Sequence, residues 1–224
     1  MSELLPLFLN LTGRAVVLVG GGPVATAKLR QLLAADADVR VIAPEVTDEI
    51  AATPGIIVER RPFEPADLDA AWLVVAAATP DVNRQVAEAA ETRRLFVNAV
   101  DDPANASAFL SGVVRRDGVT LAISTSGAAP ALTALLREGF DALLPRDLAR
   151  WMWQSRASRA AWRRDGVPME ARKPRLLQAL NDLYDRSAEG AIHAEKSVRA
   201  VSALAAGERG PRVPWLNAPE DSWL

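Results

Sequence analysis

The chain has 224 residues, of which 50% are hydrophobic, so it can form one large domain or two small ones with a real core. It has no cysteine, which excludes disulfides, thiolate nucleophiles, iron–sulfur clusters and cysteine-ligated zinc, and favours a cytoplasmic protein. It shows no signal peptide and no apolar run of the ~20 residues that span a membrane, so we expect no membrane association.

The net charge of −2 is unevenly distributed along the chain. Residues 1–145 carry 12 basic and 18 acidic side chains, whereas residues 146–224 carry 14 basic and 10 acidic ones. This asymmetry predicts two regions with different roles. The single histidine, His193, lies far from the N-terminal region and is expected at the surface. Proton chemistry near the N-terminal region would therefore fall to a carboxylate or to the substrate.

Strand and helix patterns alternate through the first hundred residues, which predicts an α/β fold with a Rossmann-like parallel sheet and helices on both faces. The expected helices are Val24–Ala35 and Pro80–Thr92, the second with Thr79 as its N-cap. The expected strands are Ala15–Val19, Val39–Ala43, Ile56–Glu59, Trp72–Ala76 and Leu95–Asn98.

After residue 106 the pattern changes to a hairpin and then to helices. Ser107–Val114 and Val119–Thr125 are expected to pair through a turn at Asp117-Gly118. Helices are expected at Pro130–Leu144, 146–165 and 174–187, the last with an apolar face of Leu176, Leu177, Leu180 and Leu183. We therefore expect an NAD-binding domain (1–106), a small α+β dimerisation and substrate region (107–145), a helical domain (146–206) and an irregular tail (207–224). A hairpin with one helix buries little by itself, so a homodimer through residues 107–145 is expected.

A glycine-rich turn follows the first expected strand and opens the first expected helix. In the pattern G-x-G-x-x-A, Gly20 permits the tight turn, Gly22 lets a pyrophosphate approach the backbone, and Ala25 lets helix and strand pack closely. The helix N-terminus then offers free N–H groups to the phosphates. A structural turn without a ligand is the alternative interpretation of this segment.

Six motifs in order make residues 4–150 resemble the precorrin-2 dehydrogenase/sirohydrochlorin ferrochelatase family of siroheme synthesis. They are Leu5–Phe8 with Leu11, Val19–Lys28, Val41–Glu45, Ala77–Thr79 with Asn83, Val97–Asp101, and Ser124–Gly127 with Pro130 and Leu135–Glu138. The resemblance implies that NAD⁺ oxidises precorrin-2 to sirohydrochlorin, and that some members then insert Fe²⁺ to give siroheme. Whether iron, cobalt or neither enters is left open by the sequence.

Asp101 matches the aspartate that the family uses in both steps. It follows the fifth expected strand, at the sheet edge where ligands bind in such folds, and a carboxylate there can accept protons from a macrocycle. The adjacent Asp102 is expected to point elsewhere. An Asp101 that only caps a loop is the alternative.

The resemblance also places cofactor contacts on Gly22, Pro23, Val24, Pro44, Glu45 and Thr79, in addition to Gly20. Glu45 is the carboxylate closest to the position where an acidic residue accepts from a ribose hydroxyl, which favours NAD over NADP. A solvated loop charge is the alternative for Glu45.

The resemblance implies that the loop of Ser124, Thr125 and Ser126 lines the macrocycle site. Hydroxyl groups there could bind carboxylates of the substrate. A helix N-cap before Pro130 is an equally good interpretation. The chain departs from the family at Ser126-Gly127, where two glycines are usual, and after Phe109, where a proline is common.

The basic segment Arg146–Arg164 holds six arginines and one aspartate, which could attract a polycarboxylate substrate or nucleic acid. A solvated amphipathic helix that packs its tryptophans on the core is favoured, and no nucleic-acid partner is expected. No histidine has a partner at metal-ligand spacing, so no resident metal site is expected. The rival function is a non-catalytic, NAD-sensing regulatory module, which would need neither Asp101 nor the loop at Thr125.

Overall fold

The computed structural model describes residues 4–110 and 112–185, which divide into two compact units. Of these described residues, the first unit comprises 4–110 and 124–130, and the second comprises 112–123 and 131–185. The expectations for His193 and for the tail 207–224 lie outside the described residues. No helix in the described ranges combines the length and the apolarity that crossing a bilayer requires.

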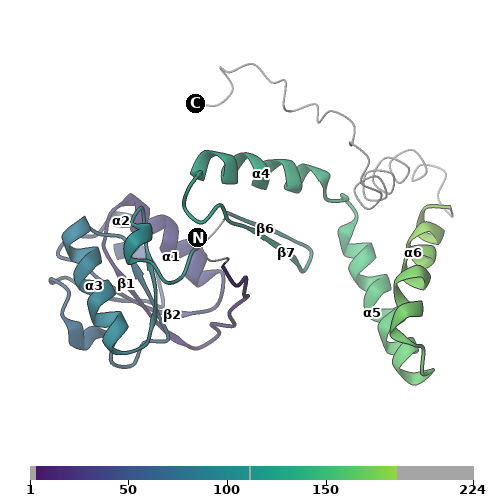
Figure 1. The fold of residues 1–224 in the computed structure, drawn as a ribbon, viewed down its shortest axis with the longest axis horizontal. Coiled ribbons are helices and arrows are strands. Elements are labelled where there is room, and N and C mark those ends of the chain that lie inside the picture. The colour runs from purple at the N-terminus through teal and green to yellow at the C-terminus, as the bar shows by residue number, and fades with distance from the viewer. Residues whose placement is uncertain (1–3, 111, 186–224) are drawn as a thin grey trace, which may run out of the picture. The chain divides into compact units, whose positions relative to one another are not determined.

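The first unit is built on a five-stranded parallel sheet with the order β3-β2-β1-β4-β5, as the alternating pattern predicted. Its strands are β1 Ala15–Val19, β2 Asp38–Ile42, β3 Ile57–Glu59, β4 Leu73–Ala76 and β5 Phe96–Ala99. The connecting helices are α1 Pro23–Leu33, α2 Asp48–Ala52 and α3 Pro80–Thr92 (Figure 1). Short 3₁₀ turns, η1 Pro65–Leu68 and η2 Pro103–Asn105, lie in the loops after β3 and β5.

Both faces of this sheet are covered at its centre, because β1 and β4 are apolar throughout and buried at every position except Ala15, the first residue of β1. Val16 and Leu18 point to one face, where they pack with Leu29 of α1 and Ile50 of α2. The alternate residues of the strands point to the other face of the sheet, among them Val17, Val19 and Val74. They pack against Leu68 of η1 and Val86 of α3.

The second unit contains the hairpin of β6 Gly112–Arg116 and β7 Val119–Ile123 with helices α4 Pro130–Leu143, α5 Leu148–Arg164 and α6 Met169–Asp185. Asp117 and Gly118 both have positive φ, as the expected hairpin turn requires. Helices α5 and α6 pack together, and the Trp151 indole donates to the Tyr184 hydroxyl, which donates to Asp147.

Two expected elements were wrong in their positions. The strand expected at Ser107–Val114 begins only at Gly112, because the backbone of Ser107 and Ala108 instead donates to the Val97 carbonyl on β5. Helix α6 begins at Met169 rather than at 174, so Pro174 lies inside the helix. Leu177 is 49% exposed and is not part of the buried face of α6.

Candidate functional site

The turn after β1 brings the glycines against two neighbouring turns at the carboxyl edge of the sheet. Gly20 has φ 122°, and a Cβ on it would overlap the carbonyl oxygen of Ala77 after β4. A Cβ on Gly21 would overlap the carbonyl oxygen of Glu45 after β2. A Cβ on Gly22, in contrast, would meet no atom within 4 Å. Gly22 therefore borders open space at the N-terminus of α1, where its N–H groups can bind a phosphate.

Hydrogen bonds join the glycine turn to the segment after β2. The Thr47 N–H donates to the Gly21 carbonyl at 2.9 Å, and the hydroxyls of Thr26 and Thr47 are also 2.9 Å apart. The Thr26 hydroxyl donates to the Gly22 carbonyl at 3.0 Å. Thr26 is 6% exposed, so these bonds are shielded from water and hold the turn in one conformation.

A pocket of about 540 Å³ opens at the carboxyl ends of β1, β2 and β4. Five of the predicted cofactor residues line it: Gly20, Gly22, Pro44, Glu45 and Thr79. Pro23 and Val24 do not line it; they are exposed in the first turn of α1. Thr79 occupies the N-cap position of α3, but its side chain makes no capping hydrogen bond.

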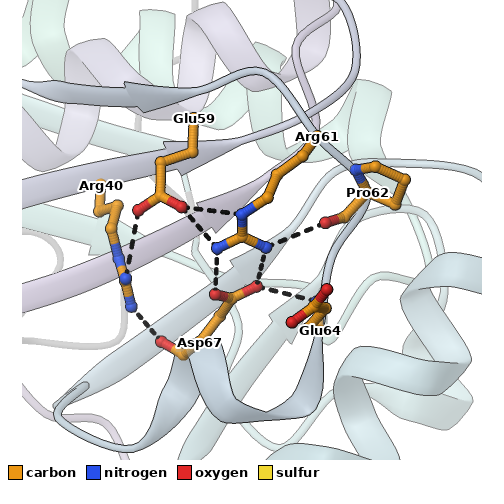
Figure 2. A network of polar contacts seen from close by, with 6 residues as sticks. All are labelled: Arg40, Glu59, Arg61, Pro62, Glu64 and Asp67. Atoms are coloured by element: carbon orange, nitrogen blue, oxygen red, sulfur yellow. Dashed lines mark hydrogen bonds and ion pairs between the residues drawn. The ribbon is translucent and has the colours of Figure 1, made fainter.

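Sequence reasoning missed the outer wall of this pocket, which Pro62 and Phe63 form after β3, and also Val82 and Gln85 of α3. An ion-pair network holds the wall in place. Arg61 binds the carboxylates of both Glu59 and Asp67 and donates to the Pro62 carbonyl at 3.1 Å (Figure 2).

Arg40 completes this network from β2, since it contacts the Glu59 carboxylate and the Asp67 carbonyl. Asp67 is only 5% exposed. Burial opposes ionisation of Asp67, but hydrogen bonds from Arg61 and the Glu64 N–H, with the charges of Arg61 and Arg40, hold the pKa of Asp67 below its usual value. An aromatic residue shortly after a strand, within the run Arg60-Arg61-Pro62-Phe63, is the signal that could have identified this wall.

Asp101 lies two residues beyond β5, exposed and with φ 56°. The carboxylate of the adjacent Asp102 accepts a hydrogen bond from the Asn105 side-chain amide at 2.7 Å, which ties Asp102 to its own turn. Lys28, half-buried on α1, interacts electrostatically with Asp101. Burial lowers the pKa of Lys28, and the charge of Asp101 partly offsets that effect.

Asn98 on β5 is 5% exposed and donates through its amide to the Ala108 carbonyl at 2.9 Å. Its Oδ1 has no hydrogen-bond partner among the described residues. Val75, beside it in the register, packs on the face of the sheet that α1 covers, so Asn98 faces that side as well. A polar group therefore lies beneath the end of β5, close in sequence to Asp101.

The loop of Ser124, Thr125 and Ser126 belongs to the first unit. Thr125 accepts through its hydroxyl from the Ala129 N–H at 3.2 Å, and the Ser124 hydroxyl accepts from the Ser126 N–H at 3.1 Å. A Cβ on Gly127 would lie 3.2 Å from Pro103, two residues after Asp101. The loop thus borders the Asp101 turn, and the hydroxyl of Thr125 also serves the segment that leads into α4.

The predicted site residues therefore form two groups, one around the pocket and one at the Asp101 turn and the loop at residue 125. Neither Asp101 nor the three hydroxyl residues line the pocket itself. Within the described residues, no three histidine, aspartate or glutamate side chains gather so that they could hold a metal ion.

The chain is similar to known proteins over most of its length. Residues 7–112 match a family model described as NAD(P)-binding. The chain is 42% identical over 152 residues to siroheme synthase 1 of Aeromonas hydrophila. The aligned region covers 66% of this chain and 33% of that protein. It is 37% identical over 206 residues to the siroheme synthase of Citrobacter koseri, covering 89% of this chain and 44% of that protein.

The chain thus spans less than half the length of these curated relatives. The solved structure of SirC, a precorrin-2 dehydrogenase, matches with a TM-score of 0.64 and 26% identity, covering 86% of this chain and 100% of that one. The family resemblance inferred from the motifs is confirmed. The chain belongs to the family formed by the N-terminal part of siroheme synthases and the precorrin-2 dehydrogenase SirC, with an NAD(P)-binding domain.

Proposed function

We propose that this chain oxidises precorrin-2 to sirohydrochlorin in siroheme biosynthesis, with NAD⁺ as the oxidant. The observation that carries the proposal is the match to SirC, which extends over the whole of that dehydrogenase. The pocket beside a glycine turn and the carboxylate at the same sheet edge supply the two halves that such a reaction needs.

The cofactor half consists of Gly20, Gly22, Pro23, Val24, Pro44, Glu45 and Thr79. The open space at Gly22 accommodates a pyrophosphate against the backbone, and the α1 N-terminus stabilises its charge. Glu45 accepts from ribose hydroxyls and repels a 2′-phosphate, which selects NAD over NADP. When bound, the nicotinamide accepts the hydride that leaves the substrate.

The substrate half consists of Asp101 with Ser124, Thr125 and Ser126. Loss of a hydride from precorrin-2 is accompanied by loss of a proton, and the Asp101 carboxylate accepts that proton. Backbone N–H groups and hydroxyls of the loop bind acetate or propionate groups of the macrocycle. Lys28, which interacts electrostatically with Asp101, places a positive charge near this carboxylate.

Several relatives are named siroheme synthases, after a product that contains a metal. Their names favour a second reaction, metal insertion, in which the same carboxylate acts. In that step the macrocycle nitrogens bind Fe²⁺, or Co²⁺, as a substrate, and Asp101 accepts the pyrrole protons that the metal displaces. A transient site of this kind needs no resident metal ligands from the protein.

The test is an anaerobic assay of the purified chain with precorrin-2 and NAD⁺, repeated with Fe²⁺ and with Co²⁺. NADH and the sirohydrochlorin spectrum should appear together, and a metal-dependent change in the spectrum identifies chelation. A folded protein that binds NAD⁺ and a tetrapyrrole but forms no NADH would overturn the proposal. NAD⁺ binding without any tetrapyrrole binding would instead identify a nucleotide-sensing module.

Asp101→Asn tests the role of the carboxylate within that assay. We expect kcat to fall by about 10²–10⁴-fold, the usual contribution of a general base, while the Kd for NAD⁺ stays unchanged. Asp102→Asn is the matched control and should retain most of the turnover, since Asp102 is already engaged with Asn105. Full turnover in Asp101→Asn would remove Asp101 from its role.

A further inference from the structure

Asn83, on the first turns of α3, is a polar residue buried to 3% exposure that the proposed chemistry leaves without a role. Its Oδ1 accepts from the Ala78 N–H at 3.0 Å, and its Nδ2 donates to the Val100 carbonyl at 3.5 Å. One amide side chain therefore connects the turn after β4 with the turn after β5.

These two turns belong to the two halves of the site. Ala78 and Thr79 line the cofactor pocket, whereas Val100 directly precedes Asp101. The Val100 N–H also donates to the Ala76 carbonyl at 2.9 Å, so the β5 turn is bound to β4 by its backbone and to α3 by Asn83.

Packing alone does not explain an amide at this position. Val86, one turn further along α3, is completely buried and shows that this face of the helix accepts an apolar side chain. A buried amide is costly unless both of its polar ends are hydrogen-bonded. Both ends of Asn83 are bonded, each to a different turn.

We propose that Asn83 is a positioning residue that sets the place of the Asp101 carboxylate relative to the bound nicotinamide. This inference rests on the proposed function. Its physical basis is geometric, since a displacement of a reacting group by about 1 Å can cost on the order of 10²-fold in rate.

Asn83→Asp separates the two hydrogen bonds. The aspartate carboxylate can still accept the hydrogen bond from the Ala78 N–H. It has no N–H to donate to the Val100 carbonyl, so an acceptor oxygen replaces the donor next to that carbonyl oxygen. We expect the Kd for NAD⁺ to change less than about threefold and kcat to fall about tenfold or more. Asn83→Ala, which removes both bonds without adding a charge, should weaken NAD⁺ binding and also lower kcat.

Val86→Ala is the matched control, because it destabilises the same helix without touching either turn. Its kcat should equal that of the wild type at a temperature where both are folded. A loss of kcat in Asn83→Asp no greater than in Val86→Ala overturns the positioning role. The positioning role is also overturned if Asn83→Asp lowers the NAD⁺ affinity and kcat by the same factor.

Hydrogen exchange gives a readout that does not depend on turnover. In Asn83→Asp, the hydrogen-bonded amides of Val100 and Asn105 should exchange faster, whereas the Ala78 amide should stay protected. Unchanged exchange at Val100 and Asn105 overturns the inference. If the wild type forms no NADH, the proposed function fails, and the exchange result alone decides whether Asn83 fixes the Asp101 turn.

Discussion

Among the residues of the glycine turn, side chains are excluded for two different reasons. At Gly20 and Gly21 a Cβ would collide with backbone carbonyl groups of the neighbouring turns. At Gly22 a Cβ would project into open space in front of α1. The first two glycines therefore allow the fold to close, whereas the third leaves room for a ligand.

Substitution by alanine should distinguish these reasons. Gly21→Ala must push the Glu45 backbone away, so we expect a lower free energy of unfolding, by about 1–3 kcal/mol. Gly22→Ala should unfold like the wild type but bind NAD⁺ about tenfold more weakly, since the methyl group occupies the approach of the pyrophosphate. Chemical denaturation and calorimetric titration measure the two effects. Equal NAD⁺ affinity in Gly22→Ala and the wild type would contradict the ligand role of Gly22.

Single residues differ in how far the sequence could predict them. The motifs located the glycine turn and the position of Asp101 after β5, because the spacing of both after strands can be read from the linear sequence. They did not indicate the contact of Gly21 with Glu45, or the bond of Asn83 to Val100, since both depend on which turns become neighbours in space. The Phe63 wall was missed for the same reason.

At the scale of elements, the pocket wall depends on the salt-bridge network that joins β2, β3 and η1. Asp67→Asn removes the charge that binds Arg61, and we expect the chain to lose about 2 kcal/mol of stability at neutral pH. Because the pKa of Asp67 is lowered in the folded protein, its stabilising effect exists above the usual aspartate range and disappears as pH falls.

The stability difference between wild type and Asp67→Asn should therefore shrink below about pH 4. Urea unfolding between pH 7 and pH 3 measures it. NAD⁺ affinity should also fall in Asp67→Asn, because Pro62 and Phe63 lose their support. A difference in stability that is constant across this pH range would contradict the role of the charge.

The strands of the sheet and the helix α3 were predicted well from their apolar runs and helical pattern. The bounds of β1 and α3 match the expectation, and the other four strands of the sheet lie within one residue of it. The helix α2 and the turns η1 and η2 were missed because five or fewer residues make less than about two helical turns, too few to show a helical periodicity. The position of β6 was wrong because the apolar run from Ser107 does not reveal that its first residues bind to β5 instead.

For the whole molecule, we propose assembly as a homodimer through residues 107–145. The hairpin of β6 and β7 has only two strands, and such a sheet is marginal in water without further burial. Within its own unit it is supported by α4, for example through Arg116, which binds Asp141 at 2.6 Å. Sedimentation of the purified chain at micromolar concentration should give twice the mass of one chain, and a monomer would refute the proposal.

At this scale the sequence predicted the order and type of the elements, but not which segments pack together in one compact unit. A parallel sheet followed by a hairpin and helices follows from the order of periodic patterns. That residues 124–130 belong with the sheet, on the far side of the hairpin in the sequence, depends on contacts such as Gly127 with Pro103. No local pattern encodes such a return of the chain.

The left-handed backbone at Asp101 limits which amino acids the position accepts. Most L-residues lose about 1–2 kcal/mol in this conformation, whereas asparagine and aspartate adopt it more readily and glycine adopts it without strain. Alanine scanning would therefore overstate the importance of the carboxylate, because it adds backbone strain to the loss of charge. Aspartate is the one acidic residue that meets both demands, since a glutamate would carry the charge but not the local preference, and the position should tolerate few substitutions of any kind.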